Sequence, residues 1–234
     1  PAREWGCDLD ALRAALTGQT ALIFIANPNN PTGTWLDGDS LEQFVRTLPD
    51  HVMVVIDEAY FEYASSPAVG ADGYPNTLEW VERYPNLIVT RTFSKCYGLA
   101  GLRMGYSVSH PAVAELMNRV RPPFNVNSIA LAAAEAALDD KVHLQRSVEM
   151  NAEGLQQLMT GFERLGLEYI PSVGNFICVD VGREAAPVYE ALLHEGVIVR
   201  PVANYGMPNH LRITVGTSEH NDIIISSLQK VLME

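Results

Sequence analysis

The chain has 234 residues, of which 47% are hydrophobic, so it is long enough to bury one large core or two smaller ones. Its 16 basic and 28 acidic side chains give a net charge of −12, which disfavours nucleic acid and anionic membranes as partners. The longest apolar runs, such as residues 21–26, are far shorter than the roughly 20 residues that cross a bilayer. We therefore expect a globular protein with no membrane span.

Strand-sized apolar runs alternate with helical patterns in the first half of the chain, which predicts an α/β fold with a mostly parallel sheet. The expected elements are strands at residues 21–26, 52–57, 87–91 and 104–108 and a helix at residues 36–48. Pro111 is placed to begin a further helix, and the Ala-rich residues 128–138 predict a helix that packs closely against a neighbour. Residues 1–138 are expected to form this larger domain.

The pattern changes near residue 140, and residues 139–234 are expected to form a small α+β domain. The expected elements are helices at residues 140–165, 185–194 and from 218 onward, and strands at residues 175–181, 197–200 and 211–215. We find no internal repeat or flexible linker in the sequence.

The cysteines and histidines do not suggest disulfides or a metal site. Three widely spaced cysteines fit neither a disulfide framework nor a zinc ribbon, which favours a reducing, cytoplasmic setting. The six histidines lack metal-binding spacing, so no metal is expected. The sequence begins at Pro1 without a signal-peptide pattern, and we expect it to start within a longer protein.

Ligands of open α/β sheets bind at the carboxyl ends of the strands, and three strand ends here carry polar residues. Residues 27–33, with the sequence NPNNPTG, follow the first strand and can be either a plain turn or a binding loop. Residues 54–60 end a strand with Asp57 and place Tyr60 on the following turn. Asp57 can cap the next helix or, if buried, keep a ring nitrogen protonated.

The third strand end contains a lysine in an apolar setting. Desolvation would lower the pKa of Lys95 from its ordinary value of about 10.4 and make its amine nucleophilic. Thr92, Ser94 and Arg103 supply hydroxyls and a guanidinium that suit a phosphate monoester. Gly98 and the glycine three residues later lack the G-x-G-x-x-G spacing, so a dinucleotide cofactor is not expected.

Four motifs in order, NPNNPTG, DEAY, TFSK with an arginine eight positions after the lysine, and LRITVGT, resemble the fold type I aminotransferases. The resemblance covers essentially the whole chain and implies pyridoxal phosphate (PLP) as cofactor and a homodimer with the site at the subunit boundary. It implies that Lys95 forms the Schiff base and moves the proton between the substrate and the cofactor. It also implies that Asp57 pairs with the pyridinium nitrogen.

The same resemblance assigns the remaining cofactor and substrate contacts. Asn30 and Tyr60 would bind the 3′ oxygen of the cofactor, and its phosphate would be held by Thr92, Ser94 and Arg103. Arg212 would bind a substrate carboxylate where one exists, with Asn175 beside it.

Residues 196–212 are similar to the histidinol-phosphate branch of this family, in which two arginines meet the substrate phosphate. By that similarity Arg200 and Arg212 would bind the phosphorylated amino alcohol L-histidinol phosphate, and glutamate or 2-oxoglutarate would be the co-substrate in histidine biosynthesis. Arg200 can instead be an exposed arginine in an ion pair. Aromatic aminotransferases and threonine-phosphate decarboxylase are the related alternatives, because they share the cofactor residues.

Members of the family also have a long N-terminal portion that supplies a glycine-containing loop for the cofactor phosphate, a stacking aromatic residue and a tyrosine that reaches the neighbouring subunit. These parts have no counterpart among the 234 residues. An alternative is therefore an inactive fragment that serves only as a structural module.

Overall fold

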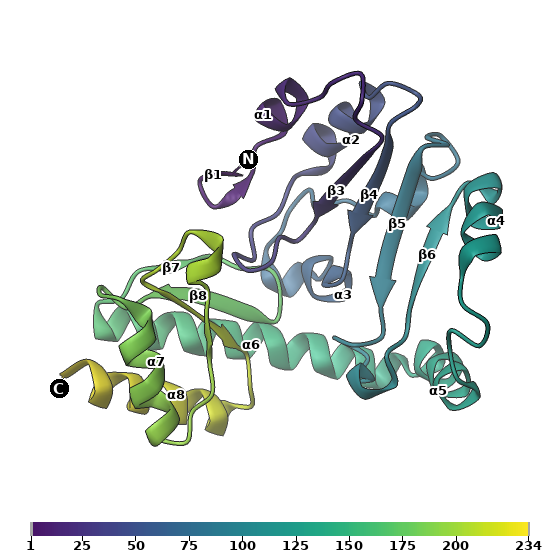
Figure 1. Cartoon of the computed structure of the whole chain (residues 1–234). Coiled ribbons are helices and arrows are strands. Elements are labelled where there is room, and N and C mark those ends of the chain that lie inside the picture. The colour runs from purple at the N-terminus through teal and green to yellow at the C-terminus, as the bar shows by residue number, and fades with distance from the viewer. Residues whose placement is uncertain (1, 234) are drawn as a thin grey trace.

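The computed structural model describes residues 2–233, and its strands form two larger sheets and one short hairpin (Figure 1). The first sheet has the order β3-β4-β5-β6. Its strands are β3 (Leu22–Ala26), β4 (Met53–Asp57), β5 (Leu87–Thr92) and β6 (Gly105–Ser109). β3, β4 and β5 are parallel, and β6 runs antiparallel to β5. The expected mostly parallel sheet is confirmed.

One face of the first sheet packs against α1 (Leu9–Ala14) and α2 (Gly38–Arg46). Leu41 and Phe44 of α2 are fully buried against strand residues such as Ile56. The expected helix start near residue 36 was early, because the Asp37 side chain accepts a hydrogen bond from the Ser40 amide and caps the helix at that point.

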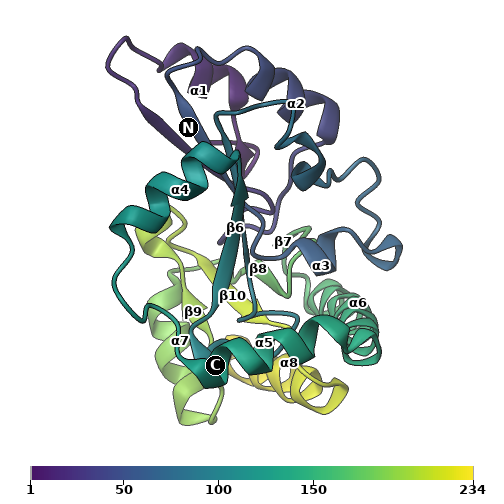
Figure 2. The ribbon, with the colours of Figure 1, turned by 90° about the vertical axis from the view of Figure 1, so that its right-hand side faces the viewer.

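Three helices follow around this sheet: α3 (Phe61–Ala64), α4 (Pro111–Val120) and α5 (Ser128–Asp139). Pro111 begins α4 as expected, and His110 caps it. Seen from the β6 edge, α4 lies beside the sheet and α5 below it (Figure 2). Close packing of α5 was expected, but Ala130 and Ala134 are its only buried residues in the described chain, and the side chain of Ile129 is 73% exposed.

The 25-residue helix α6 (Lys141–Leu165) runs from the first sheet to the second (Figure 1). Asp140 caps its beginning by accepting from the His143 amide, and Gly166 ends it in the left-handed conformation. Its buried side chains include Leu158 and Phe162, which pack into the core of the second sheet.

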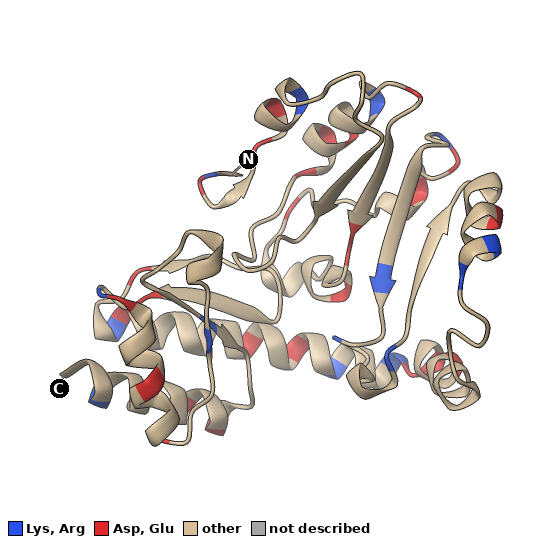
Figure 3. Cartoon of the chain, in the orientation of Figure 1, with Lys and Arg blue, Asp and Glu red and all other residues tan. Residues whose placement is uncertain are grey.

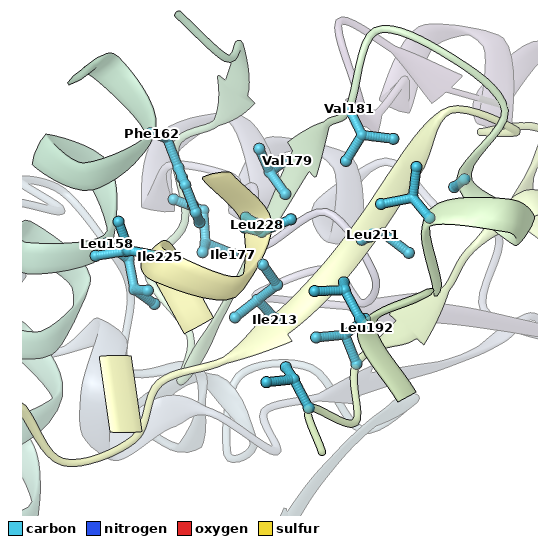
Figure 4. Close-up of a cluster of buried hydrophobic side chains, with 14 of the residues drawn as sticks. Leu158, Phe162, Ile177, Val179, Val181, Leu192, Leu211, Ile213, Ile225 and Leu228 are labelled. Carbon is cyan, nitrogen blue, oxygen red and sulfur yellow. The ribbon is translucent and has the colours of Figure 1, made fainter. Parts of the chain in front are cut away.

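The second sheet is antiparallel and has the order β7-β8-β10-β9. Its strands are β7 (Tyr169–Ile170), β8 (Phe176–Asp180), β9 (Arg200–Pro201) and β10 (His210–Thr214). α6, α7 (Ala185–His194) and α8 (Ser218–Met233) bury its core with Ile177, Leu211, Ile213 and Leu228 (Figure 4). The strand expected at residues 197–200 was wrong for its first part, because Val197 and Val199 pack into this core from irregular backbone.

Short elements complete the described chain. They are the hairpin β1 (Ala2–Arg3) and β2 (Gly6–Cys7) and the 3₁₀ helices η1 (Pro67–Val69), η2 (Thr77–Trp80), η3 (Ala100–Leu102) and η4 (Ala203–Tyr205).

The loop of residues 27–33 follows β3 and forms hydrogen bonds with the second sheet and with the segment before it. The Cys178 thiol of β8 donates to the Pro31 carbonyl at 2.9 Å, and the Val173 amide donates to the Gly33 carbonyl at 3.1 Å. Gly33 has a positive φ of 79°, and a Cβ there would lie 2.0 Å from the Ser172 hydroxyl oxygen. A side chain is therefore excluded where the two sheets meet.

Candidate active site

The parallel pairing of β3, β4 and β5 brings their carboxyl ends to one edge of the first sheet. Residues 27–33, 57–60 and 93–95 follow these three ends. Figure 3 shows charged residues of both signs at the ends of β4 and β5. Polar groups that are distant in sequence thus lie at the same edge of the sheet, as expected for open α/β sheets.

Lys95 is partly buried in this region. Its Nζ atom lies 5.3 Å from the centroid of the Tyr60 ring. Burial lowers the pKa of Lys95, the positive charges of Arg212 and Arg103 lower it further, and Asp57 partly offsets them. The expected direction of the pKa shift is confirmed, with desolvation as the largest cause. A larger share of Lys95 is therefore a neutral, nucleophilic amine at neutral pH than for an ordinary lysine.

Tyr60 is buried and packs edge-on against the Phe176 ring, with 5.1 Å between the ring centroids. Burial raises the pKa of Tyr60, and the nearby Arg212 lowers it in part. The phenol therefore stays protonated at neutral pH and can donate a hydrogen bond to a ligand oxygen.

Asp57 ends β4, and its Oδ1 atom accepts a hydrogen bond from the Thr90 hydroxyl at 3.1 Å. Its side chain is exposed among the described residues. Successive strand residues face opposite sides of a sheet. Ile56 therefore packs on the α2 side, whereas Asp57 lies on the other side with the 71% exposed Phe24, where no described helix covers it.

The predicted phosphate-binding residues lie around the turn after β5. The Thr92 hydroxyl accepts a hydrogen bond from the Ser94 amide at 3.1 Å and donates one to the Met104 carbonyl at 3.3 Å. Arg103 has a left-handed backbone with φ 53°, and its exposed guanidinium reaches the Ala100 carbonyl at 3.0 Å. Its charge acts on the Lys95 pKa, which places it near the lysine.

Arg212 of β10 extends from the second sheet to the strand ends of the first. Its Nη1 atom donates to Asn30 Oδ1 at 2.6 Å, and its guanidinium carbon lies 5.0 Å from the Phe176 ring centroid. Its buried Nε has no hydrogen-bond partner among residues 2–233. A buried unpaired donor on a cation is costly, which indicates a place for an anionic or carbonyl ligand.

Arg200 lies directly opposite Arg212 in the β9–β10 pairing, so both side chains project from the same face of the sheet. Arg200 is exposed and has no ion pair within the described residues, so the ion-pair alternative for it is not found. Two like charges opposite each other are unfavourable unless an anion lies between them.

Asn175, the remaining predicted residue, is half-buried directly before β8. Its carbonyl accepts a hydrogen bond from the Val215 amide at 3.0 Å. The neighbouring Phe176 was missed by the sequence analysis, although its ring contacts both Tyr60 and Arg212. An apolar strand residue carries no local signal for such a role. The buried pair Glu58 and Arg91 was also missed.

A family model for aminotransferase class I and II matches residues 1–228. The chain belongs to this family. It is 59% identical over 232 residues to histidinol-phosphate aminotransferase 2 of Pseudomonas fluorescens, covering 99% of this chain and 61% of that protein. It is also 59% identical over 234 residues to histidinol-phosphate aminotransferase 1 of Nitrosococcus oceani, covering 100% of this chain and 62% of that protein. The chain thus spans about three fifths of the length of these curated relatives.

Solved structures of the family share the fold. The crystal structure of histidinol-phosphate aminotransferase from Sinorhizobium meliloti, in complex with pyridoxal-5′-phosphate, matches with a TM-score of 0.87 and 33% identity, covering 97% of this chain and 61% of that one. L-Threonine-O-3-phosphate decarboxylase from Porphyromonas gingivalis matches with a TM-score of 0.82 at 22% identity, covering 95% of this chain and 68% of that one, and shows the fold alone.

Within residues 2–233, no helix combines the length and apolarity needed to cross a membrane. The same residues contain no cluster of three or more histidine, cysteine or acidic side chains arranged for a metal ion.

The donor set of this family member fits PLP. The amine of Lys95 with its lowered pKa, the protonated phenol of Tyr60 and the carboxylate of Asp57 lie at one edge of the sheet. The buried Nε of Arg212 has no hydrogen-bond partner among the described residues. These groups match the aldehyde, the 3′ oxygen and the ring nitrogen of the cofactor.

The electrostatic origin of the Lys95 pKa can be tested without cofactor. Arg212→Met should raise the pKa of Lys95, because it removes the largest repulsive charge, whereas Arg200→Met should leave that pKa unchanged. Competitive acetylation of each lysine against pH, read by mass spectrometry, gives the midpoints, with the exposed Lys141 as internal reference. A Lys95 midpoint in the wild type equal to that of Lys141 would contradict the structure.

Proposed function

We propose that the protein is a PLP-dependent aminotransferase that moves an amino group between glutamate and imidazole-acetol phosphate, forming L-histidinol phosphate. The observation that carries this proposal is the position of Lys95, a partly buried lysine beside the Tyr60 ring whose pKa is lowered by burial and by the charge of Arg212. The 59% identity to histidinol-phosphate aminotransferases supports the choice of substrate.

The proposed cofactor residues divide the work among the parts of PLP. When bound, PLP supplies an electron sink for negative charge on the substrate carbon that carries the amino group. Asp57 keeps the proton on the ring nitrogen, and Asn30 and Tyr60 hold the 3′ oxygen. The phosphate is held by Thr92, Ser94 and Arg103. These assignments rest on the motif resemblance and on the common location of the residues.

Lys95 is proposed as the group that binds the cofactor and then acts as general base and acid. When the substrate amine takes the place of Lys95 on the cofactor, the amine of Lys95 is released, and it would then be free to accept the proton of the substrate carbon and to give it up again as an acid. The lowered pKa of Lys95 favours this role, because a protonated amine cannot accept a proton.

Arg200 and Arg212 are proposed to bind the phosphate of the substrate, with Asn175 beside them. They lie opposite each other on two hydrogen-bonded strands, and the unpaired Nε of Arg212 has a free hydrogen for an oxygen ligand. Histidinol phosphate has no carboxylate, so both guanidinium groups can serve its dianionic phosphate, and glutamate can use the same cations for its carboxylates.

We further propose two domains, residues 1–138 and 139–234, a homodimer and a cytoplasmic location. The homodimer rests on the family resemblance. All three cysteines, Cys7, Cys96 and Cys178, are free thiols, as is typical of a reducing compartment. Partners of the active site are small molecules.

Asp57→Asn should leave PLP bound but lower kcat by about 100-fold or more, because an amide accepts or donates a hydrogen bond without stabilising the positive ring nitrogen. The full-length protein is assayed with histidinol phosphate and 2-oxoglutarate, and bound PLP is quantified by absorbance. Asp72→Asn, at an exposed position, is the matched control. Near-wild-type turnover of a PLP-loaded Asp57→Asn variant would limit Asp57 to a structural role.

Arg200→Ala should lower kcat/KM for histidinol phosphate by about ten- to a hundredfold, because it deletes a charge-assisted contact to phosphate. With phenylalanine as amino donor and 2-oxoglutarate as acceptor, kcat/KM should change little. Arg164→Ala removes an exposed arginine from the last turn of α6 and controls for net charge.

Equal losses for both substrates would mean that Arg200 shapes the site generally. A wild type that prefers phenylalanine would replace the proposed substrate with an aromatic amino acid. A full-length wild type that neither binds PLP nor turns over any substrate would favour a purely structural module.

A further inference from the structure

Glu58 lies next to Asp57 but points to the opposite side of the first sheet. Its side chain is fully buried and accepts four hydrogen bonds. Two come from the Thr77 amide and hydroxyl at 3.2 and 2.6 Å, and two come from Nε and Nη2 of Arg91 at 2.8 and 2.7 Å. A carboxylate with this many short contacts is held in one orientation.

Arg91 lies on β5 between Thr90 and Thr92, and its side chain is 9% exposed. Besides the two bonds to Glu58, its Nη2 atom donates to Asn76 Oδ1 at 2.8 Å. Its guanidinium carbon lies 3.4 Å from the centroid of the Phe61 ring. Arg91 therefore has a carboxylate, an amide and an aromatic face as partners, and its position on β5 is fixed by all three.

The pair lies where the β4–β5 pairing ends. Asp57 and Thr90 are the last aligned pair, and the Glu58 amide then donates to the Thr90 carbonyl at 2.9 Å. Because successive strand residues alternate sides, Asp57 and Thr90 face the proposed cofactor side while Glu58 and Arg91 face the other side. The same peptide segments thus carry the active-site groups on one side and the buried ion pair on the other.

We propose that Glu58 and Arg91 are positioning residues that hold the ends of β4 and β5 in the register that sets Asp57 opposite Thr90, just before the segment of residues 92–95. This inference rests on the proposed function for its meaning in catalysis. Stability alone does not explain the pair, since a buried ion pair can often be replaced by apolar side chains of similar volume without loss of stability. Apolar side chains at these two positions would not hold the strand ends in one defined geometry.

The test compares the double variant Glu58→Leu/Arg91→Met with the control Glu42→Leu/Arg83→Met, which removes an ion pair on the surface of the same half of the molecule. Measurements on the full-length protein are the Tm, the Kd for PLP from its absorbance, and the pH midpoint of Lys95 acetylation without PLP. The buried-pair variant should fold with a lowered Tm, because the buried Thr77 amide and hydroxyl lose their acceptor, and it should weaken PLP binding about tenfold or more and shift the Lys95 midpoint. The surface-pair control should change neither the Kd nor the midpoint.

Arg91→Lys keeps the charge but loses the two-pronged contact, so it should fold and weaken PLP binding to a smaller extent. If the double variant does not fold, the Arg91→Lys variant alone tests the positioning role. A wild-type Kd and Lys95 midpoint in the folded double variant, or in Arg91→Lys when only that variant folds, would overturn the positioning role. If the wild type fails to bind PLP, the proposed function fails, and the Lys95 midpoints still decide whether the pair positions the lysine segment.

Discussion

The parallel register of β3, β4 and β5 is the constraint on which the rest of the site depends. Ala26 pairs with Asp57, and Asp57 pairs with Thr90, so β3 and β4 end at the same level and β5 continues beyond them only to Thr92. The polar loop of residues 27–33, the acidic end of β4 and the lysine-bearing turn after β5 meet there for this reason. A slip of one residue would turn Asp57 to the α2 side of the sheet and replace it with a neighbour.

The second sheet completes the site from the other side. Arg212 reaches Asn30 across the junction, and Phe176 supports both Arg212 and Tyr60 with its ring. The site is locally cationic although the chain carries a net charge of −12. This contrast favours anionic ligands at the junction and repels them elsewhere on the surface.

Sequence patterns predicted the elements whose signals are local. α7 was predicted with its observed bounds, Pro111 marked the start of α4, and the apolar runs located β3, β4 and β5. The irregular backbone at Val197 and Val199 was not predicted, because burial against a distant core rather than strand pairing accounts for its apolar residues. The sequence left the burial of Asp57 open for a similar reason, since it depends on which side of the sheet the helices cover.

The candidate site residues were predicted from the order of four motifs along the chain. No single one of these residues would indicate the site by itself. Their partners were not found in this way, because the contacts of Glu58 with Arg91 and of Phe176 with Tyr60 join segments separated by many residues. From the sequence alone, Glu58 of the DEAY motif is only a polar residue next to Asp57. Its role becomes visible only when β5 is placed beside β4.

Lys95 is the residue of this chain that we expect to react with PLP. Incubation of the full-length protein with PLP, reduction with borohydride and peptide mapping by mass spectrometry test this expectation most directly. Because the sequence has lysines at positions 95, 141 and 230 only, the three possible sites are resolved in one experiment. We expect the reduced cofactor on Lys95 at one equivalent per chain and none in the Lys95→Ala variant. Stoichiometric labelling of Lys141 or Lys230 instead, with Lys95 unmodified, would contradict the account.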